Sequence, residues 1–178
     1  MASDYDAAGG LLVQSILAGD TKVDNRERLG AKVPIQLFQA MRLVALGSAM
    51  EDMIGDGSRA LVYQAGQRLG NVLGGAVMPQ AEGDLDKYVG LIQGVTQELG
   101  IGFVVIDKVD LDAGEINMHL DECVSCAGIT GMSAPICNFE AGMVGGLIKT
   151  FVGRSVKAVE TRCHAIGDKT CGVDVKIL

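Results

Sequence analysis

The C-terminal stretch AVETRCHAIGDKTCGVDVKIL, residues 158–178, decides the fold. Its apolar residues alternate with polar ones on both sides of AIGDKT, and this alternation is typical of half-buried β-strands joined by a turn. The spacing predicts two antiparallel strands at about 155–163 and 171–177. Cys163 ends the first strand and Cys171 begins the second, so the turn brings two thiols together.

Upstream, a second hairpin is predicted at 103–120, around a turn at Asp112 to Gly114. Helical spacing predicts helices at about 9–18, 34–55, from Ser58, from Asp84 as N-cap to Gly100, and at 133–151, whereas the glycine-rich segment 71–82 resembles a loop. This order predicts an α+β fold with helices packed on a small antiparallel sheet. The chain has 178 residues, without internal repeat or linker, which favours a single domain, 1–178.

Composition excludes several classes of function. A net charge of −7 argues against direct nucleic-acid binding, which needs clustered basic residues. The longest apolar runs are too short for a membrane span, and the N-terminus carries acids where a signal peptide carries basic residues. We therefore expect a cytoplasmic protein, in which five cysteines indicate metal or redox chemistry more than disulfides.

Four of the residues form a possible metal site. Cys137, Glu160, Cys163 and Cys171 supply three sulfurs and one carboxylate, a complete tetrahedral set for zinc. Glu160 and Cys163 are an odd number of residues apart and would face opposite ways on an ideal strand, so the site requires a bulge or a strand end near Cys163. The alternative is that these cysteines are ordinary core residues.

Cys123 and Cys126 form a separate Cys-x-x-Cys motif. This spacing suits zinc, an iron–sulfur cluster or a reversible disulfide, and no thioredoxin-like βαβ pattern surrounds it. An alternative metal or redox site therefore uses Cys123 and Cys126 with the other thiols, and an iron–sulfur cluster is its alternative cofactor. The structural alternative is that Cys123 and Cys126 are two small residues at a strand end.

The C-terminal region resembles the 4-vinyl reductase domain family. The resemblance rests on Cys137, the glycine pair Gly145 and Gly146, Gly153, Glu160-x-x-Cys163, Gly167 and Cys171, with weaker support from Gly66 and Gly70. It covers residues 30–178 and leaves 1–30 as an N-terminal extension. The resemblance implies a ligand-binding fold related to transport-particle subunits, and similarity to the sensor domains of phenol-responsive activators and to archaeal hydrocarbon-binding proteins. In the phenol sensors, a Cys and then Glu, Cys and Cys hold zinc, and these positions correspond to Cys137, Glu160, Cys163 and Cys171.

The sequence departs from the phenol sensors in its aromatic residues and histidines. There is no Trp, and Phe and Tyr together number seven, which favours an aliphatic or flat hydrophobic ligand over a phenol. The pocket histidine of those sensors has no clear counterpart. We expect His119 to be an exposed or hydrogen-bonded strand residue, and His164 to point away from the metal site.

A binding module that senses or carries a hydrophobic small molecule is the leading functional prediction. The residues expected to line its pocket are Phe38, Tyr63, Tyr88, Phe103, Met118 and Leu147. Because the N-terminal helices carry more apolar residues than one narrow face requires, we expect a homodimer through the N-terminal half. No G-x-G-x-x-G follows a strand and no P-loop is present, so no catalytic residue is assigned, although a reductase-associated enzyme subunit remains an alternative.

Overall fold

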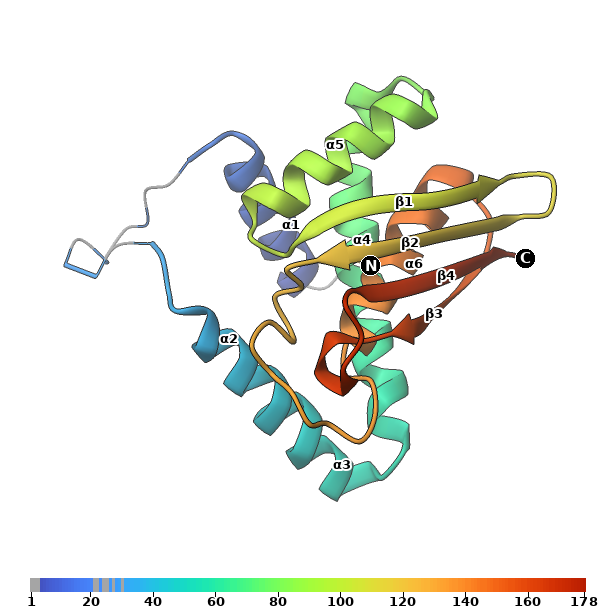
Figure 1. Cartoon of the computed structure of the whole chain (residues 1–178). Helices are drawn as coiled ribbons and strands as arrows, with labels where there is room; N and C mark the ends of the chain where they lie inside the picture. The colour runs from blue at the N-terminus through green and yellow to red at the C-terminus, as the bar shows by residue number, and fades with distance from the viewer. Residues whose placement is uncertain (1–3, 21–22, 24–25, 27, 30) are drawn as a thin grey trace.

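The computed structural model of the chain describes residues 4–20, 23, 26, 28–29 and 31–178. Helices lie on one face of a four-stranded antiparallel sheet, so the predicted α+β fold is confirmed (Figure 1). The helices are α1 (Asp4–Leu17), α2 (Ile35–Ala40), α3 (Ala49–Ile54), α4 (Gly57–Ala81), α5 (Leu85–Glu98) and α6 (Asn138–Val152), and the strands are β1 (Phe103–Asp110), β2 (Glu115–Asp121), β3 (Val156–Arg162) and β4 (Cys171–Ile177). In the described ranges, no helix is both long and apolar enough to span a membrane.

The sheet has the strand order β1-β2-β4-β3, so the two predicted hairpins pair through β2 and β4. Its inner face packs on α6 through alternate residues such as Leu120 and Val173, which are buried. On the outer face, the Asn117 amide donates a hydrogen bond to Asp174 on the neighbouring strand at 2.8 Å. The alternation in the sequence therefore separates a core face from a solvent face, as it predicts.

The prediction of a loop at 71–82 is wrong, because α4 continues to Ala81. The glycines that suggest a loop are points of close packing. A Cβ atom on Gly70 would overlap the backbone carbonyl of Met143, and one on Gly74 would approach the hydroxyl of Tyr88 to 2.5 Å. Here glycine serves close approach between helices and does not terminate one.

Helices α4 and α6 touch backbone to backbone along this contact. A Cβ atom on Gly142 would overlap the Tyr63 carbonyl, and one on Gly146 would overlap the Gln67 carbonyl. The prediction that the second of these helices begins at Ser133 is wrong, because α6 begins at Asn138. Pro135 disfavours helical backbone at the residue before it, which prevents an earlier start. Small residues from both helices thus set the position of α6 beneath the sheet.

Helix α2 continues through a π-helical segment (Met41–Ser48) into α3, and we call the whole Ile35–Ile54 unit the α2–α3 helix. It lies at one side of the molecule, apart from the sheet (Figure 1). Its buried residues are polar, Gln39 and Arg42, and the apolar residues on its outer side are exposed. The apolar periodicity of this segment therefore does not mark the face that packs on the rest of the chain.

Candidate metal centre and apolar cavity

The β3–β4 hairpin brings Cys163 and Cys171 together, one directly after β3 and the other at the start of β4. The carboxylate of Asp168 accepts a hydrogen bond from the backbone N–H of Cys163 at 2.8 Å and fixes the turn between them. The strand register shifts between Glu160 and Arg162. This irregularity is the bulge that the odd spacing of Glu160 and Cys163 requires.

The connection between β2 and α6 carries the other three cysteines. The backbone N–H groups of Cys126 and Ala127 donate to the Cys123 carbonyl at 3.2 and 2.9 Å, so this segment forms a tight turn with both thiols buried. Cys137 directly precedes the first residue of α6. Two turns and a helix start thus converge on one point.

All five thiols lie in one buried cluster. The Sγ atoms of Cys126 and Cys171 are 3.2 Å apart, and Cys137 Sγ lies 3.6, 3.7 and 3.9 Å from those of Cys123, Cys163 and Cys171. A zinc–sulfur bond of about 2.3 Å in a tetrahedral site places neighbouring sulfurs roughly 3.8 Å apart. The spacing in this cluster therefore fits thiolates that share a metal ion.

Glu160 lies beside the thiols on the β3 side of the cluster. Its Oε2 accepts a hydrogen bond from the backbone N–H of Cys137 at 3.0 Å, while its buried Oε1 has no hydrogen-bond partner among the described residues. Burial, together with a hydrogen bond to Cys163, raises the pKa of Glu160 to about 9. Hydrogen bonds with Cys126 and Cys137 lower the pKa of the Cys163 thiol to about 5. A buried carboxylate oxygen without a donor suits a metal ligand.

The cluster contains two overlapping ligand sets. In the first, single donor atoms of Cys123, Cys126, Cys137 and Cys171 all lie within 4.8 Å of one another. In the second, the same holds for Cys137, Glu160 and Cys163. The four residues predicted as zinc ligands are thus divided between the two sets: Cys171 lies with the Cys-x-x-Cys pair, Glu160 lies with Cys163, and Cys137 belongs to both sets.

The α2–α3 helix holds the turn that carries Cys123 and Cys126. The Gln39 side chain donates to the carbonyls of Val124 and Ala127 at 3.1 and 2.9 Å. These bonds occupy backbone acceptors that the tight turn leaves free. An N-terminal helix therefore positions ligand residues that follow it by more than eighty positions.

Arg42 extends this contact into a buried charged network. Its guanidinium donates to Ser125 Oγ at 3.4 Å and to the Ile136 carbonyl at 3.2 Å, and it lies 3.6 Å from the Glu140 carboxylate. The Ser125 hydroxyl also donates to Glu140. Burial raises the pKa of Glu140, and the Arg42 charge opposes that shift. The network joins the residues on both sides of the turn that carries Cys123 and Cys126.

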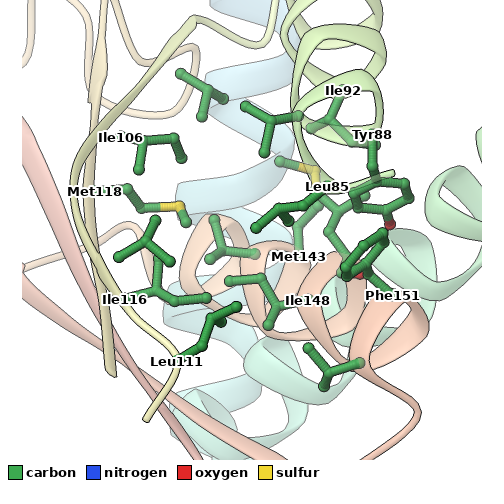
Figure 2. A pocket seen from close by; sticks show the side chains of 16 residues that line it. Leu85, Tyr88, Ile92, Ile106, Leu111, Ile116, Met118, Met143, Ile148 and Phe151 are labelled. Atoms are coloured by element: carbon green, nitrogen blue, oxygen red, sulfur yellow. The ribbon is translucent and has the colours of Figure 1, made fainter. Parts of the chain in front are cut away.

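A separate cavity of ≈ 120 Å³ lies between α5, α6 and the β1–β2 hairpin (Figure 2). Its lining residues are Leu85, Tyr88, Val89, Ile92, Val104, Ile106, Val109, Leu111, Ile116, Met118, Met143, Val144, Leu147, Ile148, Phe151 and Val152. The ring centroids of Tyr88 and Phe151 lie 4.8 Å apart at one side of the cavity. Among the lining side chains the Tyr88 hydroxyl is the sole hydrogen-bonding O–H or N–H group, and it donates to the Leu147 carbonyl at 2.8 Å.

Comparison with known proteins assigns the chain to a family. The model of the 4-vinyl reductase domain matches residues 116–177, the part that contains β2, Cys123, Cys126 and the complete β3–β4 hairpin. Two uncharacterised proteins of Methanocaldococcus jannaschii are similar to the chain. The first is 30% identical over 149 residues, which cover 84% of this chain and 79% of the relative. The second is 25% identical over 153 residues, which cover 85% of this chain and 83% of the relative. The chain belongs to the 4-vinyl reductase domain family.

Solved structures share the fold of this 4-vinyl reductase domain. The phenol-responsive sensory domain of the transcription activator PoxR with phenol has a TM-score of 0.66 at 16% identity, covering 99% of this chain and 92% of that one. A vinyl-4-reductase family protein from Methanocaldococcus jannaschii has a TM-score of 0.64 at 18% identity, with 100% and 97% covered. A trafficking protein particle complex subunit 3 from Naegleria fowleri, covalently bound to palmitic acid, has a TM-score of 0.58 at 14% identity, with 80% and 96% covered. The predicted relation to transport-particle subunits is therefore confirmed for the fold.

The six residues predicted to line a pocket fall in different parts of the chain. Tyr88, Met118 and Leu147 line the apolar cavity. The other three lie elsewhere. Phe103 is on the exposed face of β1, and the Tyr63 hydroxyl accepts a hydrogen bond from the Ala158 N–H of β3. Phe38 lines a separate groove between α2, α6 and the connection from α5 to β1. Alternation explains Phe103, because the neighbouring Val104 takes the inward position.

The two histidines of the 4-vinyl reductase domain lie outside the ligand sets. His119 Nδ1 is 2.8 Å from the Asp107 carboxylate on the outer face of the sheet, in agreement with the prediction of a hydrogen-bonded strand residue. His164 Nδ1 lies 3.2 Å from the Asp168 carbonyl in the β3–β4 turn. Sequence reasoning missed Gln39 and Arg42, and no local signal in their helix indicates that polar residues face inward there.

Proposed function

We propose that this 4-vinyl reductase domain protein binds a small apolar molecule in the cavity between α5, α6 and the β1–β2 hairpin, and that this binding serves sensing or carriage. The observation that carries the proposal is a wall of hydrocarbon side chains around ≈ 120 Å³. Apolar cavities of roughly 150 Å³ stay dry and accept benzene. The volume thus suits a single aromatic ring or a short hydrocarbon segment.

The wall favours a hydrocarbon over a phenol. The Tyr88 hydroxyl already donates to the Leu147 carbonyl, so no lining side chain can donate a hydrogen bond to the oxygen of a phenol in the cavity. Burying an acceptor without a partner costs about 1–3 kcal/mol. The PoxR sensory domain with phenol supports ligand binding in this fold, and the wall of this cavity favours a ligand without the hydroxyl.

We further propose that the cysteine cluster binds zinc, which ties the β3–β4 hairpin to the start of α6. Glu160, Cys163 and Cys171 would contribute ligands from the hairpin, and Cys137, which belongs to both compact ligand sets, would contribute from the helix start. In a four-iron cluster each thiolate binds a different iron, so the sulfurs lie farther apart than around one ion. Spacings of 3.2–3.9 Å support zinc over a four-iron cluster.

The N-terminal half supports the proposal of a homodimer. The outer side of the α2–α3 helix exposes large apolar residues, namely Leu37, Met41 and Val44. Contiguous apolar surface of this kind marks interaction sites. Light scattering at micromolar concentration should give twice the chain mass, and a monomer would remove this part of the proposal.

Ligand binding can be tested by calorimetric titration with toluene and phenol. Ile106→Phe, which fills the cavity, should abolish toluene binding. Val105→Phe is the matched control, because Val105 is the next residue on β1 and lies outside the cavity lining. Phenol should bind at least about tenfold more weakly than toluene. Equal toluene binding by both variants, or tighter binding of phenol, would contradict the proposal.

A further inference from the structure

We propose that the cysteine cluster is a two-ion centre in which the Cys137 thiolate bridges the metal ions. One ion is held by Cys123, Cys126, Cys137 and Cys171, and the other by Cys137, Glu160 and Cys163. This inference rests on the proposed metal binding and is independent of the apolar cavity. It gives the Cys-x-x-Cys pair a role as ligands and not as a separate redox site.

The first support is the number of donor groups. A tetrahedral ion takes four ligands, and five thiols and one carboxyl converge here. The two compact ligand sets share one member, Cys137. Its Sγ lies 3.6 Å from Cys123 in the first set and 3.7 Å from Cys163 in the second, so a thiolate between two ions matches its position.

The second support is the set of buried groups that a single ion would leave without a partner. An ion bound by the all-cysteine set leaves Cys163 fully buried and Glu160 Oε1 buried without a hydrogen-bond partner in the described part of the chain. An ion bound by the hairpin ligands and Cys137 instead leaves Cys123 and Cys126 as spare buried thiols. Two ions give every one of the six groups a partner, including the carboxylate oxygen.

Charge is consistent with two ions. Two divalent ions with five thiolates and one carboxylate leave two net negative charges. One divalent ion with four thiolates, a common structural zinc site, leaves the same net charge. Buried charge of this size is therefore no obstacle to the second ion, provided that all six groups release their protons when the ions bind.

An entry route to the all-cysteine set is also present. A hollow of ≈ 250 Å³ is lined by Cys123, Cys126 and Cys171, and its other lining residues include Glu122 and Lys169. A metal site needs such a path from solvent. In the second set the described part of the chain supplies three ligands. Its fourth position is thus open to a solvent molecule or a small exogenous ligand.

The test is metal stoichiometry in the full chain. Metal-free protein is titrated with Co²⁺ and followed by thiolate charge-transfer absorption, and the zinc-loaded protein is weighed by native mass spectrometry. We expect saturation at two ions per chain. Cadmium NMR of the wild-type protein should show two signals of equal intensity, with the all-sulfur site at lower field. This wild-type measurement stands even if variants fail to fold.

Variants then assign the ions. Cys126→Ser should remove the all-sulfur cadmium signal and keep the other, whereas Glu160→Gln should do the reverse. Saturation at one ion, a single cadmium signal, or a brown protein with acid-labile sulfide would each overturn the two-ion centre. Toluene binding is measured separately, so failure here leaves the cavity proposal standing, and failure there leaves the metal centre standing.

Discussion

The α4–α6 contact and the α2–α3 helix attach helices to the same core with opposite chemistry. At the first, glycines bring two backbones together and leave no room for a Cβ atom. At the second, the residues that face the core are Gln39 and Arg42, and the apolar side chains point outward. Close packing fixes α6 through shape, whereas the α2–α3 helix is fixed through a few hydrogen bonds and one ion pair. The difference teaches that shape holds α6, which follows Cys137, in place, while directional polar contacts hold the turn that carries Cys123 and Cys126.

The largest effect should come from removing the metal. This tests whether the close backbone packing and the polar contacts can keep the protein folded without it. Structural zinc contributes on the order of 10 kcal/mol to folding, comparable with the whole stability of a domain. A strong chelator should therefore unfold the β3–β4 hairpin and lower the melting temperature steeply, as followed by circular dichroism. Restoring zinc should reverse the loss. A protein that keeps its melting temperature without metal would show that packing alone holds the fold.

A methyl group in the α4–α6 contact should have the next largest effect. Gly70→Ala places a Cβ atom on the Met143 carbonyl, and because both atoms belong to helices neither can move freely. We expect a loss of about 4 kcal/mol or more in urea denaturation. Gly75→Ala on the same helix is the control. No atom lies within 4 Å of its new Cβ, so it should raise stability by about 0.5–1 kcal/mol.

Breaking the polar attachment should cost somewhat less. Arg42→Met removes the partner of the buried Glu140 carboxylate and the hydrogen bonds to Ser125 and Ile136. Loss of one partner of a buried pair costs about 3 kcal/mol or more. Arg59→Met, at an exposed position of α4, should stay within about 0.5 kcal/mol of wild type. Similar values for the two variants would mean that the polar contacts do not hold the α2–α3 helix.

The smallest expected effect concerns the cavity, where the Tyr88 hydroxyl lies among apolar lining residues. Burial raises the pKa of Tyr88 above its usual range. An unfolded tyrosine ionises near about 10, so above that pH the unfolded state releases a proton that the folded state keeps, and stability falls as pH rises.

Tyr88→Phe should therefore cost about 1 kcal/mol near neutral pH, because the hydrogen bond to the Leu147 carbonyl is lost. The difference from wild type should shrink as the pH rises past about 10 in urea denaturation. A difference that stays constant with pH would show that Tyr88 ionises equally in both states.

The sequence predicts most of the sheet and much of the site, for local reasons. Alternation places Leu120 and Val173 inward, Asp84 caps α5, and the odd spacing of Glu160 and Cys163 requires the observed bulge. These features depend on neighbours in sequence or on one hairpin partner. The cysteine positions likewise predict that thiols of the last hairpin and of the start of α6 lie close together.

What could not be predicted depends on distant contacts. Glycine has the same local meaning in a loop and in a tight helix contact, so Gly74 gives no sign that α4 continues past it. The inward direction of Gln39 follows from the free carbonyls of Val124 and Ala127, which lie far along the chain. The approach of Cys126 to Cys171 likewise depends on how a loop folds back on the sheet.

The glycine contact also limits how this family can change in length. Successive residues of an α-helix are rotated by about 100°, so adding or deleting one residue between Cys137 and Gly142 would turn the thiol away from the cluster or the glycine away from Tyr63. Length variants should therefore be excluded from this short interval. They should accumulate instead in segments such as the Asp112–Gly114 turn, where an extra residue alters neither the helix contact nor the metal ligands.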